Sequence, residues 1–262
     1  MNRLHLVELE DLPWFPALFR DAGTGFLELM VRLSGHAALL APKVEEALRR
    51  SNLRQAVVLA AGGGGPMGIV VEELEKKGLR VEGTLCDLYP NLPKLQAVAG
   101  ASNGKLRVEE APVDAAAIPT HLSGLRLLFN SFHHFDRPLA KSVLQAAVRD
   151  GQPIAIFEVV SREVLPLIGL LLAPLNFALT LPLQRPFRWA WLPFTFLLPV
   201  IPAFILWDAI VSWLRIWSVP ELKELTAELD APGWTWDIGL IKLGGAPAHA
   251  TYLIGYPPTP PS

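Results

Sequence analysis

Four consecutive glycines, Gly62 to Gly65, follow an apolar run, and Asp87 ends the next apolar run. Glycine lacks the Cβ that keeps a backbone away from a ligand, so such a loop can closely approach a nucleoside-bearing cofactor. An acid about 20 residues further on, at the end of the following strand, can accept hydrogen bonds from ribose hydroxyls. The spacing therefore predicts a nucleoside-binding site at one edge of a sheet.

Two adjacent histidines, His133 and His134, follow a third apolar run. A histidine at the carboxyl end of a strand can act as a general base near neutral pH, and the alternative is a histidine packed in a loop. Glu158 is a weaker candidate, which could instead pair with Arg162. We expect no metal site, because adjacent histidines do not readily face one ion and neither a cysteine cluster nor a spaced acid pair accompanies them.

The elements that must position these residues alternate as in an α/β protein. Five apolar stretches alternate with helical patterns, which predicts a parallel sheet with right-handed crossovers. The turn GGAPAH separates two final strands and is too short for anything but an antiparallel pair. We expect a Rossmann-like, mostly parallel seven-stranded sheet with helices on both faces, closed by a C-terminal antiparallel hairpin. The strands are expected at 55–61, 80–87, 105–110, 125–130, 153–160, 235–243 and 250–256, with helices at 68–77, 91–100 and 138–149.

The chain divides by composition into a helical cap, a core, an apolar insertion and a return to the core. In the cap we expect one helix starting at Pro13 and another over 42–50. Ser218 and Glu221 have the spacing of a capping box that starts the last helix. The expected divisions are the cap at 1–52, the cofactor-binding core at 53–162, the insertion at 163–217, the closing helix and hairpin at 218–257, and a disordered tail at 258–262.

Four motif positions resemble those of the class I S-adenosylmethionine-dependent methyltransferase family, and the likeness covers roughly residues 55–161 and the C-terminal hairpin. They are the glycine run, Asp87, the pair Asp114-Ala115, and the segment NSFHHF that starts at Asn130. The resemblance implies S-adenosyl-L-methionine as the cofactor. It places the cofactor against Ala61, Gly62, Gly63, Gly64, Asp87, Leu88, Asp114, Ala115 and Asn130.

Within that set the resemblance implies separate roles. Gly62 and Gly64 would face the methionine and ribose portion, Asp87 the ribose hydroxyls, and Asp114 the adenine amino group. Asn130 would line the methyl-donor pocket. It could also help to hold the methionine ammonium group.

The chain departs from the family pattern in strand one. Val58 stands where the family carries an acid that helps to hold the methionine ammonium group, and Ala60 stands where the first glycine is usual. Backbone carbonyls and Asn130 are the remaining acceptors. The alternative function is therefore a non-catalytic or differently catalytic membrane-associated protein of the same fold.

The segment ahead of the sheet also resembles a branch of these enzymes in which helices close the cofactor pocket. Trp14, Arg20 and Thr24 would contribute there. The alternative is a surface helix with Trp14 as a packing anchor.

Two uncharged runs, 164–184 and 189–207, follow the fifth strand. Each is long enough to cross a hydrocarbon layer of ~30 Å as a helix, but prolines interrupt both. Arg185 and Arg188 between them oppose a crossing from the cytoplasm. We expect a hairpin that dips into one leaflet, and the alternative is an apolar lid or a homodimer interface.

The charge and cysteine content limit which partners and which compartment we expect. Lys and Arg number 23 against 25 Asp and Glu, and the lack of a basic block argues against nucleic acid. A single cysteine, Cys86, excludes an internal disulfide and fits a reducing cytoplasm. We expect a methyltransferase for a hydrophobic or lipid-like small molecule, peripheral or monotopic on the inner face of a membrane, with its oligomeric state open. Candidate substrate contacts are Trp14, Arg20, Glu158, Asp208, Ser212 and Arg215.

Overall fold

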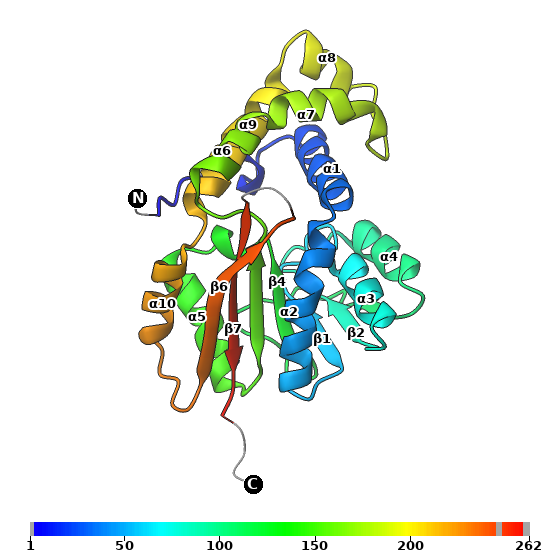
Figure 1. The fold of residues 1–262 in the computed structure, drawn as a ribbon. Coiled ribbons are helices and arrows are strands. Elements are labelled where there is room, and N and C mark those ends of the chain that lie inside the picture. Colours follow the sequence, from blue (N-terminus) through cyan, green and yellow to red (C-terminus); the bar gives the residue numbers. More distant parts are fainter. Residues whose placement is uncertain (1–2, 245–247, 259–262) are drawn as a thin grey trace.

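The computed structural model describes residues 3–244 and 248–258, and a seven-stranded sheet forms its centre (Figure 1). The strand order is β3-β2-β1-β4-β5-β7-β6, with β1 to β5 parallel and the last two strands antiparallel to their neighbours. This confirms the predicted fold class. The strands are β1 (Gln55–Val58), β2 (Glu82–Leu85), β3 (Leu106–Val108), β4 (Leu125–Phe129), β5 (Ile154–Glu158), β6 (Thr235–Lys242) and β7 (His249–Tyr256).

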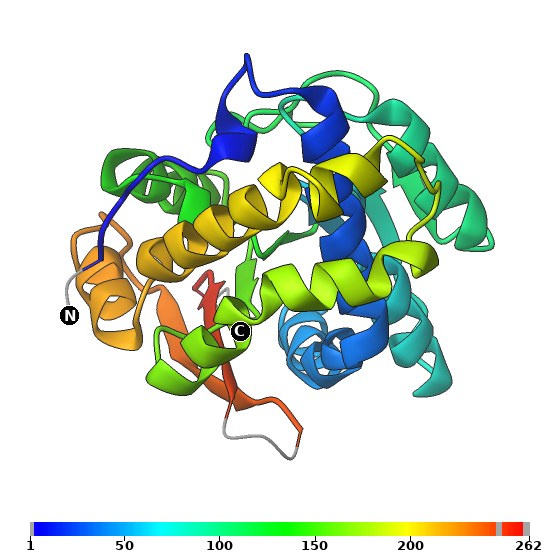
Figure 2. The same ribbon diagram turned by 90° about the horizontal axis from the view of Figure 1, so that it is seen from above.

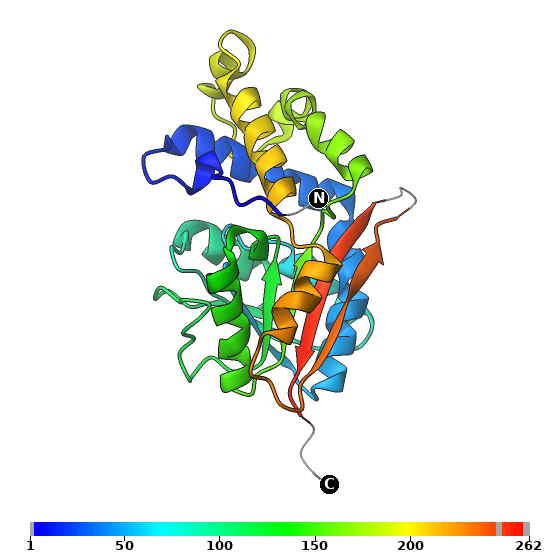
Figure 3. The same cartoon turned by 90° about the vertical axis from the view of Figure 1, so that its left-hand side faces the viewer.

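Alternate residues of the central strands face two different hydrophobic layers. Val58 packs with helices on one face of the sheet, whereas Val57 packs with helices on the other. Figure 3 shows the sheet between these two layers. The first layer is formed by α2 (His36–Arg50), α3 (Met67–Lys76) and α4 (Leu92–Ala101), and the second by α5 (Arg137–Arg149) and α10 (Val219–Ala227).

Local capping explains where several helices begin. The Asp136 carboxylate accepts a hydrogen bond from Leu139 N at the start of α5. The predicted capping box of Ser218 and Glu221 is confirmed at the start of α10. The hairpin turn lies partly outside the described residues, at 245–247, and so does most of the predicted tail.

The N-terminal segment differs from the prediction. A short turn, η1 (Leu9–Asp11), precedes α1 (Ala17–Ser34), and α2 begins at His36 rather than at Pro42. Gly35, in a left-handed conformation with φ 66°, separates the two helices. Pro42 lies inside α2, where the buried side chains on either side of it keep the helix on the sheet.

The insertion forms short helices over the carboxyl ends of the parallel strands (Figure 2). Its aromatic side chains pack with Phe15 and Phe26, and the Trp191 indole N–H donates to Leu18 O at 2.9 Å. The cap and the insertion therefore share one core above the sheet. The elements are α6 (Val164–Leu171), α7 (Ala173–Thr180), η3 (Leu181–Leu183), α8 (Trp191–Phe196) and α9 (Val200–Arg215).

Within the described residues, no helix is by itself both long enough and apolar enough to span a membrane. Only α9 and α10 taken together reach the required length and hydropathy, and a bend of 53° separates them.

Candidate functional site

The glycine loop is shaped by left-handed backbone and by close contacts. Gly62, Gly64 and Gly65 have φ of 55°, 99° and 54°. A Cβ at Gly64 would lie 2.7 Å from the Val98 side chain, whereas a Cβ at Gly62 would meet open space. Glycine is thus required for the shape of the loop, and the backbone at Gly62 is open to a ligand.

Asp87 fastens this loop to the end of β2. Its Oδ2 accepts a hydrogen bond from Gly62 N at 2.7 Å, and its Oδ1 accepts one from Tyr89 N at 2.8 Å. Each oxygen keeps further acceptor capacity, since an ionised carboxylate offers about four lone-pair sites. The structure therefore brings together the glycine run and Asp87, which the sequence predicts to form one nucleoside-binding site.

The other predicted cofactor residues lie at the same edge of the sheet. Val113 N donates to Asp87 O at 2.9 Å, which places exposed Asp114 beside the end of β2. Asn130 follows β4, and its Oδ1 accepts a hydrogen bond from Val159 N at 2.7 Å. Ala61, Leu88 and Ala115 flank these positions, and the cofactor roles of the whole set stay predictions.

Glu28 on α1 was missed by the sequence analysis. A Cβ at Gly63 would collide with its carboxylate, so Glu28 lies directly over the glycine loop. Its Oε1 also accepts from Lys94 Nζ, on α4, at 2.9 Å. The available signal for this position of Glu28 was its place on an amphipathic helix. That pattern does not specify which part of the protein the helix packs against.

His133 and Glu158 form a buried pair at the ends of β4 and β5. His133 lies in the short turn η2 (Phe132–His134), and its Nδ1 is 2.7 Å from Glu158 Oε2. His133 N donates to Glu158 Oε1 at 3.0 Å. The suggested pairing of Glu158 with Arg162 is wrong, because Arg162 bonds Glu221 at 2.7 Å instead.

Glu8 and Asp11, which the sequence analysis did not single out, complete a cluster around these histidines. Glu8 is only 1% exposed, and its carboxylate oxygens lie 3.8 Å from Nε2 of His133 and 3.8 Å from Nε2 of His134. The Asp11 carboxylate lies 3.2 Å from His134 Nδ1. The expectation that adjacent histidines do not readily face one ion is therefore wrong, because both rings turn Nε2 towards Glu8. The acidic run ELED, 8–11, was the available signal.

Helix α9 supplies two predicted residues to this cluster. Asp208 accepts hydrogen bonds from the backbone N–H groups of Leu9 and Glu10, at 2.7 and 3.1 Å. Arg215 Nη1 lies 2.9 Å from Glu8 and 2.8 Å from Asp11. The insertion thus holds the N-terminal segment against the histidines.

The remaining predicted substrate contacts lie elsewhere. Ser212 is half-buried on α9. Arg20 donates to the carbonyls of Glu10, Leu12 and Phe15, so its side chain fixes the turn before α1. Trp14 is 71% exposed, which rules it out as a packing anchor.

Burial and charge shift the pKa values in the cluster. Burial raises the pKa of Glu10 to about 7 and that of Asp208 to about 6. Burial alone would lower the pKa of His134, but its hydrogen bond to Asp11 and the nearby carboxylates outweigh burial and raise this pKa to about 9. For Asp11, burial is in turn outweighed by His134 and Arg215, which hold its pKa well below the usual range. For His134, the attraction of the surrounding carboxylates thus outweighs the effect of burial on the pKa.

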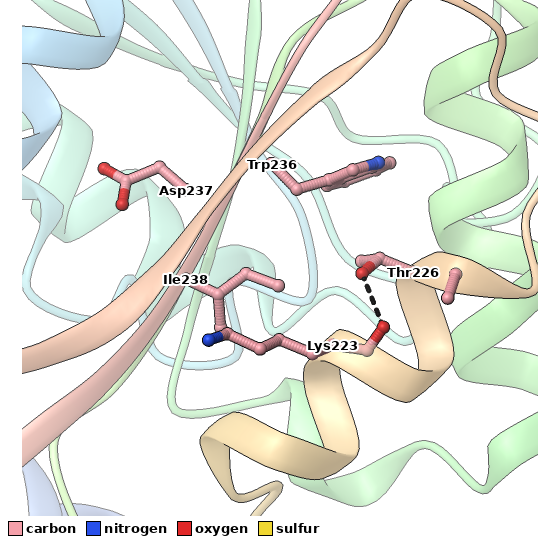
Figure 4. A pocket seen from close by; sticks show the side chains of 6 residues that line it. Lys223, Thr226, Trp236, Asp237 and Ile238 are labelled. Carbon is pink, nitrogen blue, oxygen red and sulfur yellow. Dashed lines mark hydrogen bonds between the residues drawn. The ribbon is translucent and has the colours of Figure 1, made fainter.

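A cavity of about 400 Å³ lies away from both groups of residues, between α10 and β6 (Figure 4). Lys223, Thr226 and Trp236 line it, and Trp236 is near the start of β6, which runs parallel to β5. The cavity is therefore at the opposite end of the sheet from the glycine loop. None of the predicted site residues lines it.

Comparison with protein-family models and with curated proteins gave no match. Among solved structures, that of the plantazolicin methyltransferase BpumL in complex with SAH is similar, with a TM-score of 0.52, 10% identity, and coverage of 92% of this chain and 88% of that chain. An O-methyltransferase family 2 protein from Planctomyces limnophilus, in complex with apigenin, gives a TM-score of 0.53 at 17% identity and covers 90% of this chain and 62% of that chain.

The chain spans about half the length of another similar structure, the citrinin polyketide synthase CMeT domain, with 47% of that chain covered, a TM-score of 0.47 and 13% identity. At these identities the similarity concerns the fold. The order of strands, the closing antiparallel hairpin and the glycine loop after β1 agree with it. This chain has the fold of the class I S-adenosylmethionine-dependent methyltransferases.

Proposed function

We propose that this protein is an S-adenosylmethionine-dependent methyltransferase that acts on a hydrophobic or lipid-like small molecule at a membrane surface. The observation that carries this proposal is the placement of two unlike groups at one edge of the sheet. The glycine loop and Asp87 lie at the ends of β1 and β2, and the buried pair of His133 and Glu158 lies at the ends of β4 and β5. Ligands of open α/β sheets bind at this edge.

The cofactor end has the groups that a sulfonium nucleoside requires. Asp87 has lone pairs left for the ribose hydroxyls, and Gly62 leaves room for the backbone to approach. Val58 lacks the carboxylate for the methionine ammonium group, and Glu28 brings one to the loop from α1. The acid is thereby supplied by the cap rather than by strand one. The similar structure of the plantazolicin methyltransferase BpumL in complex with SAH supports this choice of cofactor.

The cluster supplies the base that an oxygen acceptor requires. Because ionised Glu158 only accepts hydrogen bonds, His133 Nδ1 donates to it and Nε2 carries the free lone pair. Nε2 would take the proton of the acceptor hydroxyl, and Glu158 would stabilise the resulting imidazolium. When bound, S-adenosylmethionine would supply the methyl group to the acceptor oxygen, and its sulfur would leave as a neutral thioether.

The insertion supplies the apolar surface that supports membrane contact. Trp189 and Leu197, in the segment between α7 and α9, are 78% and 79% exposed. A patch of this kind on a protein surface is typical of an interaction site. Among the side chains that the structure describes, the other large exposed apolar residues of the insertion are Val164, Ile168, Leu171, Leu172, Leu175, Leu179, Leu183, Phe196, Leu198, Val200 and Trp207.

Calorimetric titration with S-adenosylmethionine and S-adenosylhomocysteine tests the cofactor. We expect saturable binding, weakened about tenfold to a hundredfold by Asp87→Ala, which removes a charged acceptor of hydrogen bonds. Asp136→Ala, at the start of α5, is the matched control and leaves affinity unchanged. If neither ligand binds at millimolar concentration, the protein is a non-catalytic or differently catalytic member of the fold.

Co-sedimentation with liposomes tests the membrane surface. The full-length protein should pellet with liposomes that contain anionic lipid, and the double variant Leu179→Asp/Leu197→Asp should stay in the supernatant. Both positions are exposed, so folding should be unaffected. Leu240→Asp on β6, exposed to 46%, is the control for added charge. Wild-type protein that stays in the supernatant would make the insertion a lid or a dimer interface.

A further inference from the structure

Two imidazoles and one carboxylate converge on a single point beneath α9. His133 Nε2 lies 3.8 Å from Glu8 Oε1 and His134 Nε2 lies 3.8 Å from Glu8 Oε2, and all three groups offer a ligand atom within 4.8 Å of the others. Two ligands on a tetrahedral ion with bonds of ~2.1 Å lie about 3.4 Å apart, so small side-chain movements suffice. We propose that Glu8, His133 and His134 bind one divalent transition-metal ion of the Zn²⁺ or Fe²⁺ type.

The hydrogen-bond partners of the two imidazole rings determine which ring nitrogen is available to an ion. His133 Nδ1 is 2.7 Å from Glu158, and His134 Nδ1 is 3.2 Å from Asp11. An ionised carboxylate only accepts hydrogen bonds, so both Nδ1 atoms donate and Nε2 is the nitrogen of each ring that faces Glu8. An ion bound there takes the place of the Nε2 proton of His134. A carboxylate behind each ligating histidine is the usual arrangement around protein-bound metals.

The third ligand is buried and lacks a hydrogen bond where the ion would sit. Glu8 is 1% exposed, and its Oε1 accepts no hydrogen bond from the described residues. The nearest cation, Arg215 Nη1, is 2.9 Å away but outside hydrogen-bonding geometry. A buried carboxylate oxygen without a hydrogen bond is costly, and a metal ion removes that cost. Arg215 keeps its bond to Asp11 when Glu8 turns to the ion.

The charge around the point favours a cation. Carboxylates outnumber the guanidinium groups that contact the cluster, and a divalent ion offsets most of the surplus. The carboxylates are Glu8, Asp11, Glu158 and Asp208, and the guanidinium groups are those of Arg3 and Arg215.

The ligand set indicates both the metal class and its use. Two imidazoles and one carboxylate suit Zn²⁺ and Fe²⁺ rather than Ca²⁺ or Mg²⁺, which prefer oxygen ligands. Three protein ligands leave a fourth position for water or for an oxygen of the acceptor. Such an ion lowers the pKa of a bound hydroxyl. In the metal-bound protein it therefore takes over the activation of the acceptor from His133, whose Nε2 lone pair then binds the ion. That use rests on the proposed function, whereas metal binding itself does not.

Metal binding is measured on the full-length chain after treatment with EDTA, without methyl donor or acceptor. Titration with Zn²⁺ should show one ion per chain, with a dissociation constant in the micromolar range or below. Glu8→Gln should weaken this at least a hundredfold, and Glu158→Gln about tenfold to a hundredfold, because it removes the support of a ligand. His121→Gln, at an exposed histidine paired with Glu109, is the control and should bind as wild type does.

A measurement on unmutated protein covers the case in which Glu8→Gln fails to fold. Co²⁺ should shift the imidazole NMR signals of His133 and His134 beyond the range of the other histidines, and Zn²⁺ should displace it. The proposal is overturned by an absence of saturable binding at millimolar Zn²⁺, by wild-type affinity in folded Glu8→Gln, or by shifts confined to His5, His36, His121 or His249. Loss of methyl-donor binding would overturn the proposed function and leave these results standing.

Discussion

The two halves of the candidate site are built in different ways. The glycine loop and Asp87 come from one continuous stretch of chain, and backbone conformation and backbone hydrogen bonds hold them. The cluster around His133 is assembled from segments far apart in the sequence, and ion pairs between buried side chains hold it. The first half presents a shape to a ligand, whereas the second presents charge and lone pairs.

This difference determines what each half tolerates. A backbone site depends on which residues fit its dihedral angles and changes little with pH. A buried charge cluster depends on every partner, because removal of one charge leaves another without compensation. Substitutions should therefore divide into those that alter binding of the methyl donor and those that alter chemistry or folding.

His133→Ala should have the largest effect and should separate the two halves most sharply. It removes the base, so kcat for an oxygen acceptor should fall about 10² to 10⁴-fold. The affinity for S-adenosylmethionine should stay as in the wild type, because His133 does not contact the glycine loop. Single-turnover kinetics and calorimetry on the same sample measure both quantities. His121→Ala serves as the control, and a joint loss of kcat and donor affinity would contradict the division.

The pH dependence of stability should reveal the buried carboxylate on α9. The pKa of Asp208 in the folded protein is about 6 against an ordinary 3.8. The folded state thus binds this proton more tightly, and the stability gained is complete below about pH 4 and lost as pH rises through about 6. The loss amounts to about 3 kcal/mol.

Urea unfolding of Asp208→Asn in buffer with EDTA isolates this effect, since the asparagine is neutral at every pH. The free energy of unfolding of the wild type, relative to Asp208→Asn, should fall by about 2 kcal/mol between about pH 4 and pH 7. Ser212→Ala, on the same helix, should follow the wild-type curve. Parallel curves for wild type and Asp208→Asn would show that burial does not raise the pKa of the Asp208 carboxyl group in the folded protein.

The sequence predicts the glycine loop and Asp87 more fully than the cluster around His133, and the reason is physical. The glycine run and Asp87 are linked through one strand-helix-strand unit, so their spacing in the sequence fixes their spacing in the fold. Glu8 and Asp11 reach the histidines because residues far along the chain, among them Asp208 and Arg215, hold the N-terminal segment down. No local pattern encodes that contact.

The same reasoning explains the errors in the cap. Gly35 ends one helix and starts the next, which the apolar pattern alone does not show. Pro42 is typical of a helix start, but here it lies inside α2, because burial of the surrounding face outweighs its missing N–H. The lack of charge in the insertion gives no sign of its shared core with α1, because that core depends on aromatic packing between distant segments.

A pair of glycine substitutions tests the claim that backbone shape governs the first half. Gly64→Ala combines a left-handed φ of 99° with a Cβ only 2.7 Å from Val98, and it should cost about 2 kcal/mol of stability. Gly65 also has a positive φ, of 54°, but a Cβ there would meet open space. Gly65→Ala should therefore cost only about 1 kcal/mol of stability. Thermal unfolding and donor titration measure both. Equal losses would mean that contact with Val98 does not shape the loop.

The smallest predicted effect concerns the one carboxylate that links the cap to the glycine loop. Glu28→Gln keeps the length of the side chain over Gly63 and removes its charge, so the affinity for S-adenosylmethionine should fall about tenfold. A donor analogue without the ammonium group should bind the wild type and the variant equally, because it lacks the cation that Glu28 holds. Lys94→Gln separates this from simple loss of the ion pair, since it frees Glu28 and should leave donor affinity equal or higher. Equal loss in both variants would instead mean that the ion pair only holds α1 in place over the loop.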